Sequence, residues 1–272
     1  MEPANYRLTH PRRDTPLRTS KTLARLRAGQ PVRMCTLGHF IPAYIRHAAH
    51  FGYDCIWLDL EHRALSEREA QTLLAYFHLH DIDCMLRAPT LEKTRLYRYL
   101  EDGATGLMIP HVSTVEKARM LVDAVKFPPL GDRGLDGAGL DSDFYLQTGD
   151  DYVEAANRET FLVVQIETPQ AVENVDEIAA VDGVDGLFIG PGDLGLRIRR
   201  TGTDLTMQQA YERVAAAARR HKKAWGCPAA TREDVQTLHA QGAQLIAYGG
   251  DFSAFMTMLK GHASDLNEVY GS

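Results

Sequence analysis

Short apolar runs alternate with amphipathic stretches along the chain, and this pattern predicts strands that alternate with helices. The apolar runs lie at residues 32–37, 54–59, 83–87, 106–110, 161–167, 185–189, 224–227 and 243–248. The amphipathic stretches lie at residues 41–51, 66–80, 91–102, 114–126, 169–180, 207–222 and 231–241, and 252–268 follows the last strand. Two helices carry capping signatures, because Ser66 precedes Glu69 by three residues and Thr231 precedes Asp234 in the same way.

A strand followed by a helix eight times predicts a (β/α)8 barrel, with a doubly wound sheet as the alternative. The chain has 272 residues, a length at which such a barrel is commonly one domain. We expect the barrel domain to cover residues 19–272. Residues 1–18 are expected to form a flexible arm or a strap at a subunit interface.

One connection is much longer than the others and runs from Phe127 to Thr160. It follows the fourth strand-helix unit and is expected to include a short helix near 150–158. Long connections in compact domains are commonly functional, so we expect a lid or a subunit contact here.

Charge and cysteine content narrow the class of protein. The formal net charge is −6 and the isoelectric point is near 6.0, which gives no reason to expect a nucleic-acid or membrane partner. The N-terminal stretch lacks the apolar core of a signal peptide, and no apolar run is long enough to cross a bilayer. The four cysteines lie in or beside apolar runs without a CxxC spacing. These features predict a cytoplasmic protein with buried thiols.

Polar residues gather at the carboxyl ends of the predicted strands, where the active sites of such barrels lie. They are Asp59, Glu61, His62, Arg87, His111, Gln165, Glu167 and Asp193. In the stretch IWLDLEH, strand alternation places Trp57, Asp59 and Glu61 on one face and the aliphatic residues on the other. We therefore expect the polar face to open into a site at this end of the barrel.

The residue types at these strand ends indicate a hard divalent cation and a 2-oxo acid. Two carboxylates from different strands, Glu167 and Asp193, suit Mg²⁺ or Mn²⁺. The glycines of IGPGDLG, at 189–195, would let backbone N–H groups hold a carboxylate. Asp59 and His62 could form a carboxylate–imidazole pair that moves a proton, and Arg87 could stabilise an enolate oxygen.

Several segments resemble the HpcH/HpaI aldolases, a family of metal-dependent class II pyruvate aldolases. The family includes 4-hydroxy-2-oxoheptanedioate aldolase and 2-keto-3-deoxy-sugar-acid aldolases. The matching segments are DLEH (59–62), LRAP (86–89), GATGLMIPHVSTVEKA (103–118), KFPPLGDRG (126–134), VVQIETPQAVENVDEIAAVDGVDGLFIGPGDL (163–194) and YGGD (248–251). They follow one another in family order over residues 20 to 265.

The resemblance implies a TIM barrel in which Glu167 and Asp193 bind Mg²⁺, Mn²⁺ or Co²⁺. It also implies that the amides of Gly192 and Asp193 receive the carboxylate of pyruvate. Arg87 would contact the ketone or enolate oxygen. The implied reaction is reversible retro-aldol cleavage of a 4-hydroxy-2-oxo acid to pyruvate and an aldehyde through a metal-bound enolate.

The same resemblance implies supporting residues and an assembly. Asp59 and His62 would assist proton transfer, while Glu61 and Gln165 would lie behind the groups that touch substrate and metal. The implied assembly is a homo-oligomer, a trimer or hexamer, in which 252–268 packs on a neighbouring subunit.

Three departures from the family pattern concern the second substrate. Glu101 stands near a position where relatives often have Leu-Asp, so we expect it to be the acceptor-side carboxylate. The long connection carries Asp136, Asp141 and Asp143 where arginines are common in relatives. The run of Arg197, Arg199 and Arg200 is also unusual; we interpret it as a solvated face or subunit contact, with binding of an anionic acceptor as the alternative. The acceptor half is therefore expected to differ from the familiar members.

Two other functions are compatible with these residues. The same site could serve an oxaloacetate decarboxylase or another enzyme that diverts the enolate, because fold and site do not fix the outcome. A non-catalytic barrel that only binds a small molecule is the second alternative. Retention of His62, Arg87, Glu167 and Asp193 argues against it.

Overall fold

Eight parallel strands form a closed barrel in the order of the sequence, in a computed structural model that describes residues 18–271. The strands are β1 (Val32–Leu37), β2 (Cys55–Asp59), β3 (Asp83–Arg87), β4 (Gly106–Ile109), β5 (Phe161–Ile166), β6 (Gly186–Ile189), β7 (Ala224–Ala229) and β8 (Leu245–Gly250). The barrel prediction is confirmed, and the doubly wound alternative is wrong because β1 pairs with β8 and closes the sheet. The predicted arm lies outside the described residues except for Arg18.

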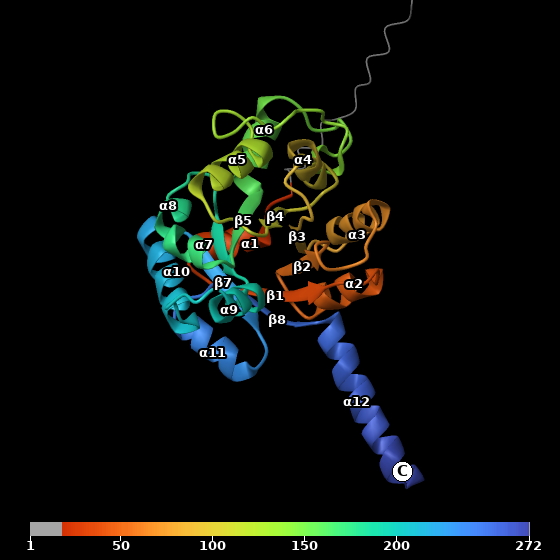
Figure 1. Cartoon of the computed structure of the whole chain (residues 1–272). Coiled ribbons are helices and arrows are strands. Elements are labelled where there is room, and N and C mark those ends of the chain that lie inside the picture. The colour runs from red at the N-terminus through yellow and green to blue at the C-terminus, as the bar shows by residue number, and fades with distance from the viewer. Residues whose placement is uncertain (1–17, 272) are drawn as a thin grey trace, which may run out of the picture.

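The described residues form twelve α-helices, most of which surround the barrel in an outer layer (Figure 1). They are α1 (Lys21–Arg27), α2 (Pro42–His50), α3 (Glu67–Leu79), α4 (Lys93–Glu101), α5 (Val115–Val125), α6 (Asp150–Glu159), α7 (Pro169–Glu173), α8 (Val175–Ala179), α9 (Pro191–Arg200), α10 (Met207–His221), α11 (Arg232–Ala240) and α12 (Asp251–Tyr270). The helix predicted at 169–180 is broken at Asn174, and α1 and α9 were not predicted.

Both predicted capping signatures form capping boxes. The Ser66 hydroxyl accepts from the backbone N–H of Glu69 at 3.3 Å, and the Glu69 carboxylate accepts from the backbone N–H of Ser66 at 2.8 Å. Thr231 and Asp234 make the same reciprocal pair at the start of α11. These bonds satisfy N–H groups that have no partner inside the helix.

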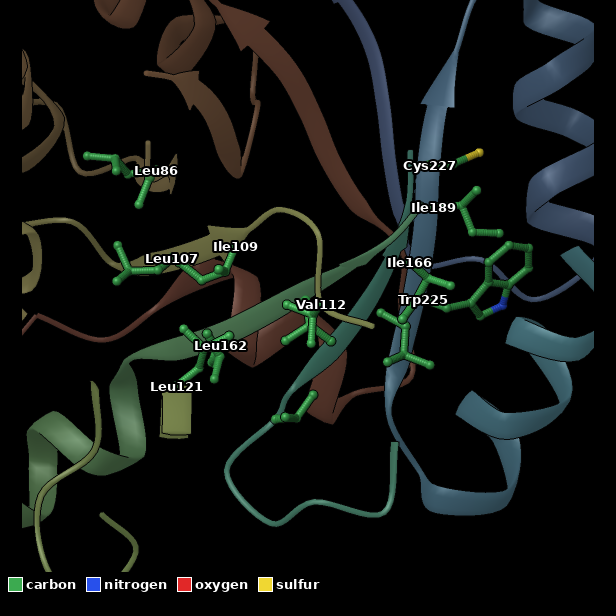
Figure 2. Close-up of a cluster of buried hydrophobic side chains, with 14 of the residues drawn as sticks. Leu86, Leu107, Ile109, Val112, Leu121, Leu162, Ile166, Ile189, Trp225 and Cys227 are labelled. Atoms are coloured by element: carbon green, nitrogen blue, oxygen red, sulfur yellow. The ribbon is translucent and has the colours of Figure 1, made fainter. Parts of the chain in front are cut away.

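Strand alternation divides the core into two layers. Ile56, Leu58 and Leu60 belong to the large cluster between strands and helices, whereas Trp57 belongs to the cluster that fills the barrel. Figure 2 shows part of the outer cluster, including Leu107 and Ile109. Because successive side chains alternate, the residues that continue the inner face of β2 point toward the barrel interior. The expected division of IWLDLEH into two faces is confirmed.

The long connection leaves the barrel at its amino end. It follows α5, which returns the chain from the carboxyl ends of the strands, and it leads through a 3₁₀ turn (Leu140–Ser142) and α6 to β5. The predicted short helix coincides with α6. Inside the connection, Asp141 accepts from both Arg133 and Tyr152 at 2.7 Å. This segment therefore does not form a lid over the carboxyl end of its own barrel.

The last helix projects away from the barrel (Figure 1). Beyond its buried first residue, Asp251, α12 is exposed along its length, including the apolar side chains of Phe255, Met256 and Leu259. All four cysteines are buried and free, as predicted. No helix within residues 18–271 has the length and apolarity needed to span a membrane.

Candidate active site

A buried ion pair joins the carboxyl ends of β2 and β3. Asp59 and Arg87 face each other in the strand register, and Arg87 donates from Nε and Nη2 to the two carboxylate oxygens at 2.8 and 2.7 Å. The guanidinium carbon also lies 4.7 Å from the centre of the Trp57 ring. Burial alone would raise the pKa of Asp59, but the hydrogen bonds and charge of Arg87 outweigh it and lower that pKa. Asp59 is therefore a fixed anion that orients Arg87.

Glu61 and His62 extend this group toward solvent. Glu61 Oε2 lies 3.0 Å from Arg87 Nη1 and 3.6 Å from Nε2 of His62, whose ring is about half exposed. Asp59 accepts from the backbone N–H of His62 at 3.3 Å but makes no contact with its ring. The predicted Asp59–His62 side-chain pair is wrong, because Arg87 occupies both Asp59 oxygens and the chain turns after β2. The carboxylate beside the His62 ring is that of Glu61.

Glu167 is held at the end of β5 by His111. Its Oε1 accepts from the backbone N–H of His111 at 2.6 Å and lies 2.9 Å from Nδ1 of the same residue. The other ring nitrogen of His111 lies 3.4 Å from Glu61, so His111 joins the two carboxylates. This geometry requires a left-handed backbone at His111, with φ of 56°, and Lys117 Nζ donates to its carbonyl at 2.7 Å. Sequence reasoning left the role of His111 open.

Burial and two neighbouring carboxylates oppose the negative charge of Glu167. Only 2% of Glu167 is exposed, and burial together with the nearby carboxylates of Asp193 and Glu61 raises its pKa. Gly190 allows this arrangement, since a Cβ there would lie 2.4 Å from Glu167 Oε2. A buried acid among other acids is stabilised by an added cation.

Asp193 and the amides beside it lie in the first turn of α9. Pro191 begins the helix and has no N–H, so Gly192 and Asp193 supply backbone donors that lack partners inside the helix. The space around Gly192 is open, since a Cβ at this position would have no neighbouring atom within 4 Å. These two donors and the positive end of the helix dipole are suited to bind a carboxylate.

Arg197 reaches into the site and is the main residue that sequence reasoning misjudged. Its Nη1 lies 2.5 Å from Asp193 Oδ1 and donates to the carbonyl of Glu167 at 3.3 Å. The interpretation of Arg197 as part of a solvated face is therefore wrong, although Arg199 and Arg200 are exposed. The sequence feature that indicates this contact is the four-residue spacing between Asp193 and Arg197, because residues four apart in a helix lie on the same face.

The donor set fits a hard divalent cation that keeps water or substrate ligands. Glu167 and Asp193 are carboxylates from two different strand ends. The raised pKa of Glu167 shows that its negative charge would be stabilised by an added cation. The open space at Gly192 leaves room for further oxygen ligands on that cation. Within residues 18–271, no group of three or more His, Cys, Asp or Glu side chains forms a metal cage. Such a set suits Mg²⁺ or Mn²⁺ better than structural zinc.

Gln165 lies on the inner face two residues before Glu167 and is almost fully buried. Its side-chain oxygen has no hydrogen-bond partner among the described residues. Buried amide oxygens are normally paired, so this atom is available to a water molecule or a substrate hydroxyl.

Glu101 does not belong to this site. It is the last residue of α4, which returns the chain to the amino end of β4. Its environment there includes Arg133 and Asp141 of the long connection, and burial raises its pKa. The structure therefore does not bring Glu101 to the predicted acceptor side within its own barrel, because the carboxyl ends of the strands lie at the opposite end.

Adding one methyl group at Gly190 should disturb Glu167 without removing any charged group. We expect Gly190→Ala to lower kcat/KM about 10- to 100-fold, similar to losses seen when residues that orient a metal ligand are changed. The reason is the 2.4 Å approach of the new Cβ to Glu167 Oε2. Steady-state kinetics beside the control Gly261→Ala, in an exposed helical turn with no atom near the added carbon, measures the effect. Equal activity of Gly190→Ala and the unmodified protein would contradict it.

Comparisons with known proteins show which family the chain resembles over most of its length. The family model described as HpcH/HpaI aldolase/citrate lyase matches residues 34–257. The hydroxypyruvate/pyruvate aldolase of Delftia acidovorans is 34% identical, over 85% of this chain and 86% of its own length. The 5-keto-4-deoxy-D-glucarate aldolase of Salmonella paratyphi C is 33% identical, over 75% and 80%. The crystal structure of an HpcH/HpaI aldolase from Desulfitobacterium hafniense superposes with a TM-score of 0.82 at 31% identity, covering 90% of this chain and 96% of that one.

Proposed function

Because the chain belongs to the HpcH/HpaI aldolase/citrate lyase family, we propose that it cleaves a 4-hydroxy-2-oxo acid reversibly to pyruvate and an aldehyde with the aid of a divalent metal. One observation carries the proposal: a buried arginine on β3 and two carboxylates at the ends of β5 and β6 share the carboxyl end of one barrel. The relatives named as pyruvate and sugar-acid aldolases support pyruvate as the common product.

Glu167 and Asp193 would hold the cation, whose contribution when bound is to polarise the ketone as a Lewis acid. The backbone N–H groups of Gly192 and Asp193 bind the carboxylate of the oxo acid. Together these groups orient the ketone of the substrate toward the barrel interior.

Arg87 stabilises the negative charge that develops on the ketone oxygen during cleavage. A guanidinium has five N–H donors. Two of them donate to Asp59, and Nη1 lies 3.0 Å from Glu61 Oε2, so donors remain for the substrate. Because Asp59 fixes the guanidinium before substrate binds, little reorganisation accompanies the reaction.

His62 moves the protons, and Glu61 orients its ring. Cleavage removes the proton of the C4 hydroxyl, the C3–C4 bonding electrons pass into the enolate, and C3 then takes up a proton to give pyruvate. His62 is accessible enough to exchange a proton with a water molecule, since its side chain is 54% exposed. Glu61 replaces Asp59 as the carboxylate beside it.

A substrate panel tests the reaction assignment. We expect Mn²⁺-loaded protein to join pyruvate to at least one aldehyde of the panel, and to cleave the product again. Oxaloacetate tested beside the hydroxy-oxo acids separates an aldolase from a decarboxylase, because the two reactions form the same enolate from different substrates, by loss of an aldehyde or of carbon dioxide. Decarboxylation without any carbon–carbon bond formation would contradict the proposal.

Arg197 competes with a cation for Asp193. We expect Arg197→Met to tighten Mn²⁺ binding about 3- to 10-fold, because a positive charge is removed near the cation at a partly solvated site. Isothermal titration calorimetry measures the affinity directly, and Arg200→Met on the same helix is the matched control. Weaker binding by Arg197→Met would show that the arginine positions Asp193 instead.

We also propose a homo-oligomer in which α12 packs on a neighbouring subunit. Its exposed apolar side chains, among them Met256 and Leu259 at 68% and 59% exposure, lie together on one helix, as apolar side chains do at protein–protein contacts. We expect Leu259→Glu to shift the assembly toward monomer in sedimentation velocity, while the control Lys260→Glu leaves it unchanged. A monomeric unmodified protein at micromolar concentration would contradict this proposal.

A further inference from the structure

A carboxylate–imidazole pair lies at the ends of β1 and β8, apart from the site described above. Asp251 is buried and accepts from the backbone N–H groups of Gly38 and His39, at 3.0 and 2.9 Å to Oδ2. Its Oδ2 also lies 2.6 Å from Nδ1 of the His39 ring, which is partly exposed. Because an ionised carboxylate can only accept, Nδ1 carries the hydrogen toward Asp251, and in the neutral ring the lone pair then lies on Nε2.

An aromatic ring connects this pair to an arginine. Phe252 lies 4.2 Å from the His39 ring, measured between ring centres, and Arg63 lies over Phe252 with its guanidinium carbon 4.4 Å from the ring centre. Gly38 makes room for this arrangement, since a Cβ there would lie 2.7 Å from Arg63 Nε and 2.8 Å from Phe252. The side chains of His39, Arg63 and Phe252 therefore form one group, which we name the rim group.

The rim group adjoins the first site after β2 and continues past β1 to β8. Arg63 Nε lies 3.9 Å from Asp59 Oδ2, so the group begins beside the Asp59–Arg87 pair. Strands β1 and β8 lie opposite β5 in the closed ring. A substrate whose oxo-acid end lies at Glu167 and Arg87 has the rim group beside it when its other end extends toward β1, β2 and β8.

Both polar members of the rim group have free hydrogen-bonding capacity. Arg63 donates from Nη1 to the carbonyl of His62 at 2.8 Å, and no described residue accepts from its Nη2. Within residues 18–271, no partner occupies Nε2 of His39 either. A planar guanidinium stacked on an aromatic ring is well suited to bind a carboxylate, and a neutral imidazole nitrogen accepts from a hydroxyl.

We propose that Arg63 and His39, held by Phe252 and Asp251, bind the acceptor part of the substrate and select an aldehyde that carries both a carboxylate and a hydroxyl group. This inference rests on the proposed aldolase function and adds the acceptor class to it. Arg63 binds the carboxylate, and Nε2 of His39 accepts from the hydroxyl. Asp251 acts only through His39 and is a positioning residue.

Pairs of acceptor aldehydes test each contact separately. Succinic semialdehyde and butanal differ in the carboxylate, while glyceraldehyde and propanal differ in the hydroxyls. We expect Arg63→Met to lower the kcat/KM ratio of the first pair about 10- to 100-fold, as for loss of a hydrogen bond to a charged group. We expect His39→Asn, which keeps a donor toward Asp251 but lacks Nε2, to lower the ratio of the second pair about 5- to 10-fold.

Two control variants guard against a general loss of folding. Arg63→Lys keeps the positive charge but not the planar donors, so it should retain part of the preference for succinic semialdehyde. Arg46→Met replaces an exposed arginine of α2 and should change neither ratio. Ratios that stay constant in both Arg63→Met and His39→Asn would overturn the inference.

Exchange of pyruvate methyl protons with deuterated water, followed by NMR, separates this inference from the proposed function because it needs no aldehyde. Exchange by the unmodified protein together with unchanged acceptor ratios in the variants would overturn the acceptor assignment alone. Absence of exchange in the unmodified protein would overturn the proposed function and the rim-group assignment with it.

Discussion

Replacing Glu167 by glutamine should weaken Mn²⁺ binding more than about 100-fold and should abolish detectable retro-aldol turnover. This loss of affinity is larger than the loss expected when a residue that only orients a metal ligand is changed. Glutamine preserves the shape of the side chain and removes only its negative charge. Asp193→Asn should act in the same direction through the second ligand. Calorimetric titration with Mn²⁺ and a cleavage assay measure the two effects.

The same substitution should stabilise the metal-free protein. The pKa of Glu167 is raised by burial and by Asp193 and Glu61, so the folded protein favours the protonated acid. The resulting destabilisation develops as the pH rises above the ordinary glutamate value of about 4.3 and is complete above the raised pKa. Glu167→Gln should therefore raise Tm in chelator at pH 7 more than at pH 4.

The exposed Glu173 of α7 provides a matched control for this prediction. Glu173→Gln should bind Mn²⁺ and turn over as the unmodified protein does. Full activity of both Glu167→Gln and Asp193→Asn in metal-free buffer would contradict the assignment of the ligands. A lower Tm for Glu167→Gln would contradict the electrostatic account of the site.

Replacing Arg87 by methionine should affect both turnover and folding. Loss of one preorganised donor to a developing oxyanion costs about 3–4 kcal/mol of barrier, or roughly 10²- to 10³-fold in kcat. The change also leaves Asp59 buried without its partner, and breaking a buried pair in this way costs about 3–5 kcal/mol of stability. Enzyme kinetics and urea unfolding measure the two losses independently.

The double variant Asp59→Asn with Arg87→Met separates these effects. Neutral asparagine removes the unpaired charge, so much of the lost stability should return while turnover stays low. Recovery of turnover in the double variant would show that Arg87 serves only to neutralise Asp59. Equal losses of stability in the single and double variants would contradict the buried-pair explanation.

The architecture could be predicted from the sequence because it depends on local patterns. Apolar runs of strand length and amphipathic stretches of helix length fix the order of elements, and closure of the barrel follows from eight repeats. The exceptions lie where local signals are weak. The segment of α9 contains Gly192, Gly195 and three arginines, and its helix depends on Pro191 at the first position and on packing of Leu194 in the core.

The candidate site could be predicted only as a set of residues. Placement at strand ends brought Asp59, Arg87, Glu167 and Asp193 to one end of the barrel, but pairing depends on distances across strands that a linear pattern does not contain. Arg87 pairs with Asp59 because the two are neighbours in the β2–β3 register. The short sequence distance between Asp59 and His62 therefore did not identify the carboxylate that lies beside the His62 ring, which is Glu61.

The misplacement of Glu101 has a different physical reason. Similarity to a family pattern placed a carboxylate near β4 along the chain, but residues just before and just after a barrel strand lie at opposite ends of the barrel. His111, which follows β4, reaches Glu167, whereas Glu101, which precedes it, reaches the long connection. Position relative to the strand decides which residues meet.

The most direct measurement is exchange of the methyl protons of pyruvate with deuterated solvent, followed by proton NMR on protein freed of metal by a chelator. The account predicts no exchange above the buffer rate in the chelated protein and rapid exchange after addition of Mn²⁺. Exchange at the same rate with and without the metal, or no exchange in either state, would contradict the central claim that Glu167, Asp193 and Arg87 form a metal-assisted enolisation site.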